Sequence, residues 1–94
     1  MTVTEVDGSH HPKLAPHARL TFSATRGRPV VLLPETVGVL NDSGAAVLGL
    51  CDGRRTVDAI TAELAERYRD VRAREVRRFL TGLVARRWVV LDDA

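Results

Sequence analysis

The side chains that could perform chemistry are few. One thiol, Cys51, and three imidazoles, His10, His11 and His17, are present among the 94 residues. A single cysteine cannot form an internal disulfide or a zinc site built on several thiolates, and adjacent histidines in a flexible segment do not preorganise a metal site. Phosphate-loop, metalloprotease and nucleophile-elbow motifs are also missing. We therefore expect no catalytic residue, metal or cofactor, and a binding module rather than an enzyme.

The distribution of arginine is more informative than the net charge of +2. Residues 67–87 hold eight arginines and two carboxylates, a local net charge of +6. Three interpretations remain open: a solvated helix face, a surface for nucleic acid, and a surface for an acidic peptide. The chain has only four aromatic residues, which argues against a base-stacking platform for single-stranded nucleic acid.

Three short strands are predicted in the first half of the chain. Residues 18–23 and 36–40 alternate between apolar and polar or small side chains, and residues 30–33 form a β-branched, apolar run. Residues 25–29 read as a turn, in which Gly27 can adopt a positive φ. The three strands are expected to form an antiparallel meander.

Three helices are predicted in the second half. Asp42 is the expected N-cap of the first helix, and Gly53 is expected to end it. Thr56 is the expected N-cap of the second helix, and the third spans about 72–87, before a closing strand over residues 88–91. Cys51 and Tyr68 lie on the inward apolar stripes, so Cys51 is expected to be a buried structural thiol. The expected fold is α+β and winged helix-turn-helix-like: a three-stranded antiparallel β-meander, three α-helices and a short C-terminal strand.

The domain boundary is predicted from composition. Residues 1–16 are rich in Gly, Ser, His, Pro and Thr without apolar periodicity, and we expect a flexible N-terminal tail. Residues 17–94 are expected to form one folded domain. Apolar stretches fall far short of the ~20 residues that cross a bilayer, and the N-terminus lacks a secretory pattern. We expect a cytoplasmic protein with no membrane contact.

Two binding modes compete. In the first, the helix over 72–87 enters a DNA major groove, although carboxylates on the preceding helix would repel phosphates. In the second, strand 36–40 accepts an extended peptide at its edge, which is uncharged and lacks proline. Gly38 would leave room for a neighbouring backbone, and the third helix would supply an arginine-bearing wall that suits an acidic and apolar peptide. The predicted peptide-binding residues are Val37, Gly38, Val39, Arg74, Arg77, Arg78 and Thr81. The competing structural interpretation is that residues 88–91 cover this strand.

The stretch LNDSGAAVLGLCDGRRTVDAI over residues 40–60, preceded by Leu33-Pro34-Glu35, resembles the PqqD family of pyrroloquinoline quinone (PQQ) biosynthesis. The resemblance covers about residues 15–91. It implies a recognition element for ribosomally synthesised and post-translationally modified peptides (RiPPs), a winged-helix, peptide-binding domain. Such a domain would bind the precursor peptide PqqA by strand addition beside the third strand and third helix, and would present it to the radical SAM enzyme PqqE without itself performing a reaction.

The cargo and the oligomeric state are left open by the resemblance. Similar domains serve other peptide-modifying pathways, including mycofactocin-type systems, and a fold alone does not specify the peptide. An exposed strand edge also permits a homodimer.

Overall fold

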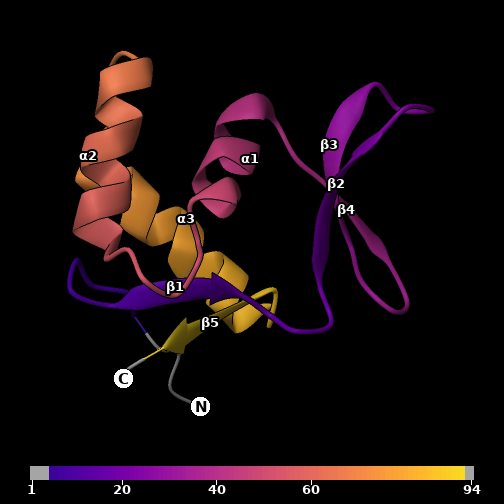
Figure 1. Cartoon of the computed structure of the whole chain (residues 1–94), viewed down its shortest axis with the longest axis horizontal. Helices are drawn as coiled ribbons and strands as arrows, with labels where there is room; N and C mark the ends of the chain where they lie inside the picture. The colour runs from indigo at the N-terminus through magenta and orange to yellow at the C-terminus, as the bar shows by residue number, and fades with distance from the viewer. Residues whose placement is uncertain (1–4, 93–94) are drawn as a thin grey trace.

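The computed structural model describes residues 5–92, which form two small antiparallel sheets and three helices (Figure 1). The elements follow the order β1 (His11–Leu14), β2 (Arg19–Ser23), β3 (Arg28–Leu32), β4 (Val37–Val39), α1 (Asp42–Gly49), α2 (Val57–Arg67), α3 (Ala73–Ala85) and β5 (Val89–Asp92). In Figure 1 the three helices gather above the β1–β5 pair, while the β2–β3–β4 sheet stands to one side of α1. Within residues 5–92, no helix has the length and apolar character that a bilayer crossing requires.

The β2–β3–β4 sheet is the predicted antiparallel meander, with strand ends shifted by one or two residues. Leu20 pairs with Val31, and Val31 pairs in turn with Gly38. The turn between β2 and β3 contains Gly27 at a φ of 64°, as the sequence predicts, because glycine adopts this region without a steric penalty. β4 forms one edge of the sheet and β2 forms the other.

The first two helices begin with side-chain caps. Asn41, rather than the predicted Asp42, is the N-cap of α1, and its Oδ1 accepts a hydrogen bond from the Gly44 N–H at 2.7 Å. Asp42 is instead the first helical residue, where its carboxylate suits the positive end of the helix dipole. Thr56 caps α2 as predicted, and its Oγ1 accepts from the Ala59 N–H at 3.1 Å.

Two helix ends differ from the sequence-based expectation. α1 ends at Gly49, and Gly53 takes its positive φ of 81° in the loop that follows rather than at the helix terminus. Tyr68, predicted on the inward stripe of the second helix, is the C-cap of α2 and is 40% exposed. The helix stops short of Tyr68, so its ring is not carried onto the buried face.

Strand β1 lies in the segment predicted to be a flexible tail. Its residues pair with β5 from His11 opposite Asp92 to Leu14 opposite Val89, and Val6 further upstream is buried. The structure therefore differs from the predicted tail over residues 1–16, of which residues 1–4 lie outside the described residues. Composition misleads here because the pairing partner lies at the other end of the chain, where no local pattern can signal it.

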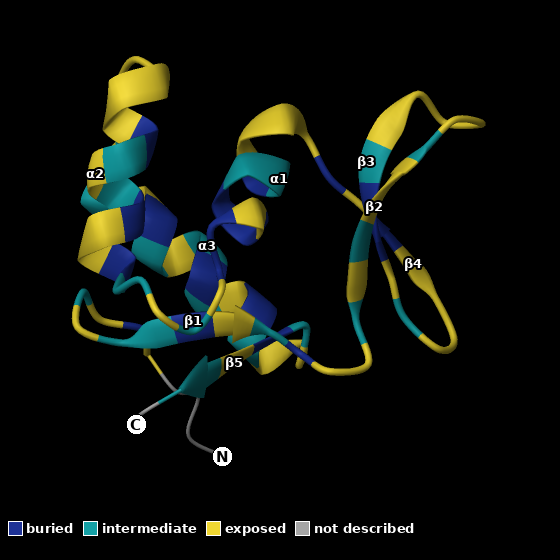
Figure 2. Cartoon of the chain, in the orientation of Figure 1, coloured by how far each residue is buried: buried dark blue, intermediate teal, exposed yellow. Residues whose placement is uncertain are grey.

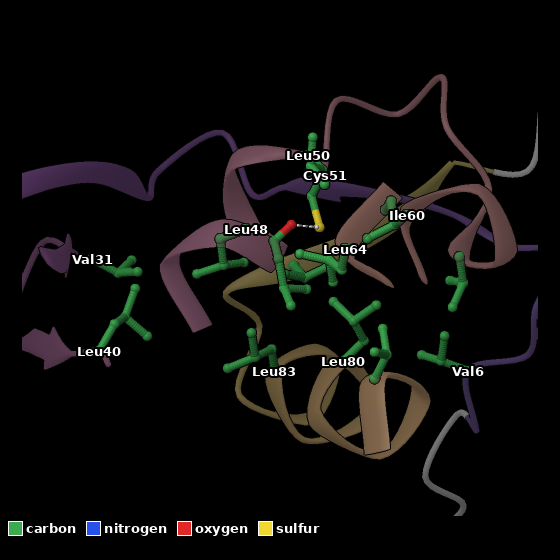
Figure 3. Packing of buried hydrophobic residues seen from close by; sticks show 14 residues of the cluster. Val6, Val31, Leu40, Leu48, Leu50, Cys51, Ile60, Leu64, Leu80 and Leu83 are labelled. Atoms are coloured by element: carbon green, nitrogen blue, oxygen red, sulfur yellow. Dashed lines mark hydrogen bonds between the residues drawn. The ribbon is translucent and has the colours of Figure 1, made fainter. Parts of the chain in front are cut away.

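One buried apolar cluster joins the helices to both sheets (Figures 2 and 3). Ile60 of α2 and Leu80 of α3 are fully buried in it. The Cys51 thiol donates to the Val47 carbonyl oxygen at 3.2 Å, and burial, assisted by the charge of Asp52, raises the pKa of the thiol to about 12. A thiol that stays protonated at neutral pH is a poor nucleophile, so the prediction of a buried structural cysteine is confirmed.

Candidate functional site

The outer edge of β4 has no partner strand among residues 5–92. β4 is the last strand in the order β2–β3–β4, whereas β5 pairs with β1. The interpretation in which residues 88–91 cover this edge is therefore wrong: residues 89–91 pair with β1, and Trp88 packs on a face of β4 rather than on its edge. An edge of this kind can accept another extended chain.

The phase of the hydrogen bonds shows which groups of β4 face outward. The Leu40 N–H, directly after β4, donates to the Pro29 carbonyl oxygen at 3.0 Å. Bonded positions recur at every second residue of an antiparallel pair, so Gly38 directs its N–H and C=O toward β3. The N–H and C=O groups of Val37 and Val39 consequently point to the open edge.

The two faces of β4 differ in exposure. Val37 and Val39 lie on one face of the strand and are 38% and 48% exposed, and Figure 2 colours much of β4 yellow for exposed residues. Gly38 is buried on the opposite face, and a Cβ at this position would overlap the ring of Trp88. The Arg86 guanidinium lies 5.6 Å from the centroid of that ring. The space left by Gly38 is thus filled by Trp88. The prediction that this space receives the backbone of a guest peptide is therefore wrong.

A hollow of about 370 Å³ begins where β4 ends. It lies between the N-terminus of α1, the turn between α2 and α3, and α3 itself. The Phe79 ring approaches within 3.2 Å of the position at which a Gly44 side chain would begin. Because apolar side chains and charged groups both line it, the hollow suits an apolar side chain with a charged neighbour. Its apolar lining includes Val47, Val71, Val76 and Phe79, and its charged lining includes Arg69, Arg72 and Glu75.

The four predicted site residues on α3 gather elsewhere. Arg74, Arg77, Arg78 and Thr81 line a second hollow, of about 580 Å³, whose remaining lining comes from residues 5–7. The structure therefore brings these four residues together, but it does not bring them to β4.

Helical geometry explains this separation. Arg77 and Thr81 each lie two residues from Phe79, which rotates them about 160° away from it around the helix axis. Phe79 points toward Gly44, in the first turn of α1, just after β4. The side of α3 that faces the start of α1, just after β4 in the chain, is therefore the Phe79 side, not the arginine side.

Sequence reasoning missed Phe79 and Trp88 as site residues. It assigned Phe79 to the core stripe and Trp88 to the closing strand, and both are in fact half-buried. Two glycine positions in the sequence could have indicated that these aromatic residues lie at the site. Gly38 and Gly44 each leave out a side chain where an aromatic ring from the C-terminal half comes close.

Comparison with known proteins relates this geometry to a family. A family model described as "Coenzyme PQQ synthesis protein D (PqqD)" matches residues 29–89. The chain is 44% identical over 73 residues to a PqqA binding protein of Rhodopseudomonas palustris (strain BisB5), covering 78% of this chain and 69% of the relative. It is 42% identical over 65 residues to the bifunctional coenzyme PQQ synthesis protein C/D of Methylorubrum extorquens, covering 69% of this chain and 18% of that longer protein.

A solved structure shares the fold. The solution NMR structure of the PqqD truncation of Methylobacterium extorquens PqqCD, described as a stand-alone RiPP recognition element, matches with a TM-score of 0.76. The sequences are 35% identical, and the match covers 96% of this chain and 99% of the other. The α+β fold is thus the fold of a RiPP recognition element. The chain belongs to the PqqD family, which confirms the resemblance seen in the sequence.

Proposed function

We propose that this protein binds a PqqA-like precursor peptide as an added strand on the open edge of β4 and presents it to the radical SAM enzyme PqqE in PQQ biosynthesis. The outward N–H and C=O groups of Val37 and Val39 carry the proposal. A guest strand can bond to all four groups without disturbing the existing ladder, because Gly38 alone serves β3 from this strand.

Affinity and selectivity would come from different groups. Each main-chain hydrogen bond contributes about 0.5–1.5 kcal/mol and is insensitive to the guest's sequence. Side chains of the guest that alternate along the added strand would contact exposed Val37 and Val39 on one face. Where the guest passes the end of β4, an apolar side chain can enter the hollow beside Phe79.

The proposed role is to hold the peptide, not to modify it. The relatives named PqqA binding protein and the recognition-element structure both support peptide binding. Binding of this kind requires no cofactor, and it would take place in the cytoplasm, where the ribosomal precursor is made. The chemistry on the peptide would belong to the enzyme that receives it.

A titration tests the proposal. Unlabelled PqqA is added to ¹⁵N-labelled protein, and backbone amide and Trp88 indole shifts are followed. We expect the largest changes at residues 36–41 and at Phe79 and Trp88. Changes that avoid all of these positions would contradict strand addition on β4. A mycofactocin-type precursor peptide serves as the comparison, and tighter binding of that peptide would assign the chain to the alternative pathway.

A further inference from the structure

The arginine surface is the face of α3 formed by Arg74, Arg77, Arg78 and Thr81, with residues 5–7 beside it. Arg74 and Arg78 are exposed, and Arg77 and Thr81 are half-buried. They surround a hollow of about 580 Å³, so the surface is concave rather than flat. The N-terminal segment is attached to it through the Val6 N–H, which donates to Thr81 Oγ1 at 3.1 Å.

The cations of this surface are not neutralised within the described chain. Arg74, Arg77 and Arg78 take part in none of the ion pairs among residues 5–92. Glu5 and Asp7 border the same hollow, but neither carboxylate lies within ion-pair distance of these guanidinium groups. Arginines spaced three and four residues apart on a helix repel one another. An anionic partner would remove this repulsion.

The arginine surface stays free when a peptide occupies β4. Arg74, Arg77 and Thr81 lie about 140–160° around the helix axis from Phe79, and Arg78 lies about 100° from it. Phe79 faces the first turn of α1, which follows β4 in the chain. One helix therefore separates two surfaces that can be occupied at the same time. A protein that presents a peptide to an enzyme needs this arrangement, since the peptide and the enzyme must both be bound.

We propose that the arginine surface docks an acidic surface of the enzyme that modifies the bound peptide; this inference rests on the proposed function. Guanidinium groups pair with carboxylates in a bidentate manner, and arginine is enriched at protein interfaces. The complementary patch carries carboxylates opposite the three arginines and basic groups opposite Glu5 and Asp7. A nucleic acid fits less well, because those two carboxylates would face its continuous phosphate chain.

The test compares two variants with the same change in net charge. R74E/R78E reverses two exposed cations of the arginine surface, and R26E/R54E reverses two exposed arginines in loops far from it in sequence. Binding of each variant to purified PqqE and, separately, to PqqA peptide is measured by calorimetry. We expect R74E/R78E to lose roughly tenfold or more of its affinity for PqqE, with PqqA affinity within about twofold of wild type. R26E/R54E should bind both nearly as the wild type does, and binding to PqqE should weaken with added salt.

Several results would overturn the docking surface. The proposal is wrong if the wild-type protein does not bind PqqE, with or without peptide. It is also wrong if R74E/R78E and R26E/R54E bind PqqE with equal affinity. A tenfold loss of PqqA affinity in R74E/R78E would show that the arginines contact the peptide, as the sequence predicts, and not the enzyme.

Salt-sensitive binding of a short DNA duplex that R74E/R78E alone abolishes would assign the surface to nucleic acid. If wild type binds PqqE but not PqqA, the proposed function fails while the docking surface stands. The neutral pair R74Q/R78Q repeats the measurement should charge reversal impair folding.

Discussion

The ring of Trp88 lies against the inner face of Gly38, in the space that a side chain at position 38 would need. Gly38 is the middle residue of β4, and Trp88 directly precedes β5 in the other sheet. The contact therefore links two sheets that share no strand. It also supports, from behind, the strand whose outer edge is proposed to receive a peptide.

A Gly38→Ala substitution should destabilise the fold by about 1–3 kcal/mol, because its methyl group cannot coexist with the Trp88 ring unless one of them moves. Urea denaturation measures this cost. In a Trp88→Leu background the smaller side chain leaves space, so the cost should fall, with a coupling of about 0.5–3 kcal/mol. If the losses in free energy of unfolding of the two single variants add in the double variant, the Trp88 ring does not contact residue 38.

Local patterns predicted the meander and the helices because their signals lie within a few residues. The strands at β2 and β4 alternate, and the caps precede apolar stripes. The pairing of β1 with β5 was invisible, since it joins opposite ends of the chain and His11–Leu14 has the composition of a tail. Nothing local distinguishes such a segment from a disordered one.

The sequence predicted the strand edge of the candidate site but not the side of α3 that lies beside it. The open edge at Val37 and Val39 follows from a short, uncharged strand without proline, and the structure has it at the edge of the sheet. The facing side of α3 could not be deduced, because half-buried Phe79 and Arg77 flank the same core stripe on opposite sides. Which of these two sides faces the start of α1, just after β4, depends on how α3 packs on α1. The spacing of apolar residues along α3 does not reveal that packing.

Replacing Val39 with proline should weaken peptide binding roughly tenfold or more while leaving stability nearly unchanged. Its N–H points to the open edge, so proline removes a donor for the guest without breaking a bond to β3, and proline is tolerated at such edge positions. Calorimetric titration with PqqA measures the loss. Val39→Ala keeps the N–H and isolates the side-chain contribution. If both variants lose the same affinity, main-chain bonding at Val39 is not part of recognition.

Phe79→Ala should reduce peptide affinity roughly tenfold, because it removes an apolar wall from the hollow at the end of β4. The matched control is Phe22→Ala, an identical change at a ring that is 63% exposed on β2, away from the proposed site. Fluorescence anisotropy with labelled PqqA compares the two. Equal affinities for both variants would remove Phe79 from the site.

Thr81→Val should loosen the N-terminal segment without affecting PqqA binding. Thr81 Oγ1 accepts from the Val6 N–H at 3.1 Å, and losing this acceptor beside a buried residue should cost about 1–3 kcal/mol of stability. Hydrogen exchange at the Val6 amide should accelerate in Thr81→Val, whereas Thr81→Ser retains the hydroxyl and should exchange as the wild type does. A loss of PqqA affinity in Thr81→Val would instead support the sequence-based prediction that Thr81 contacts the peptide.

Stability should fall at alkaline pH through Cys51. Burial raises the pKa of this thiol from 9.0 to about 12, so above pH 9 the unfolded chain releases a proton that the folded chain retains. The contribution is complete below pH 9 and is lost as pH rises toward 12, at up to about 1.4 kcal/mol per pH unit. Urea denaturation of wild type and Cys51→Ala, from about pH 8 to about pH 10.5, isolates the effect because other titrating groups are common to both. The free energy of unfolding of wild type should decline more steeply than that of Cys51→Ala. Parallel curves would mean that the thiol ionises in the folded protein as readily as in the unfolded chain.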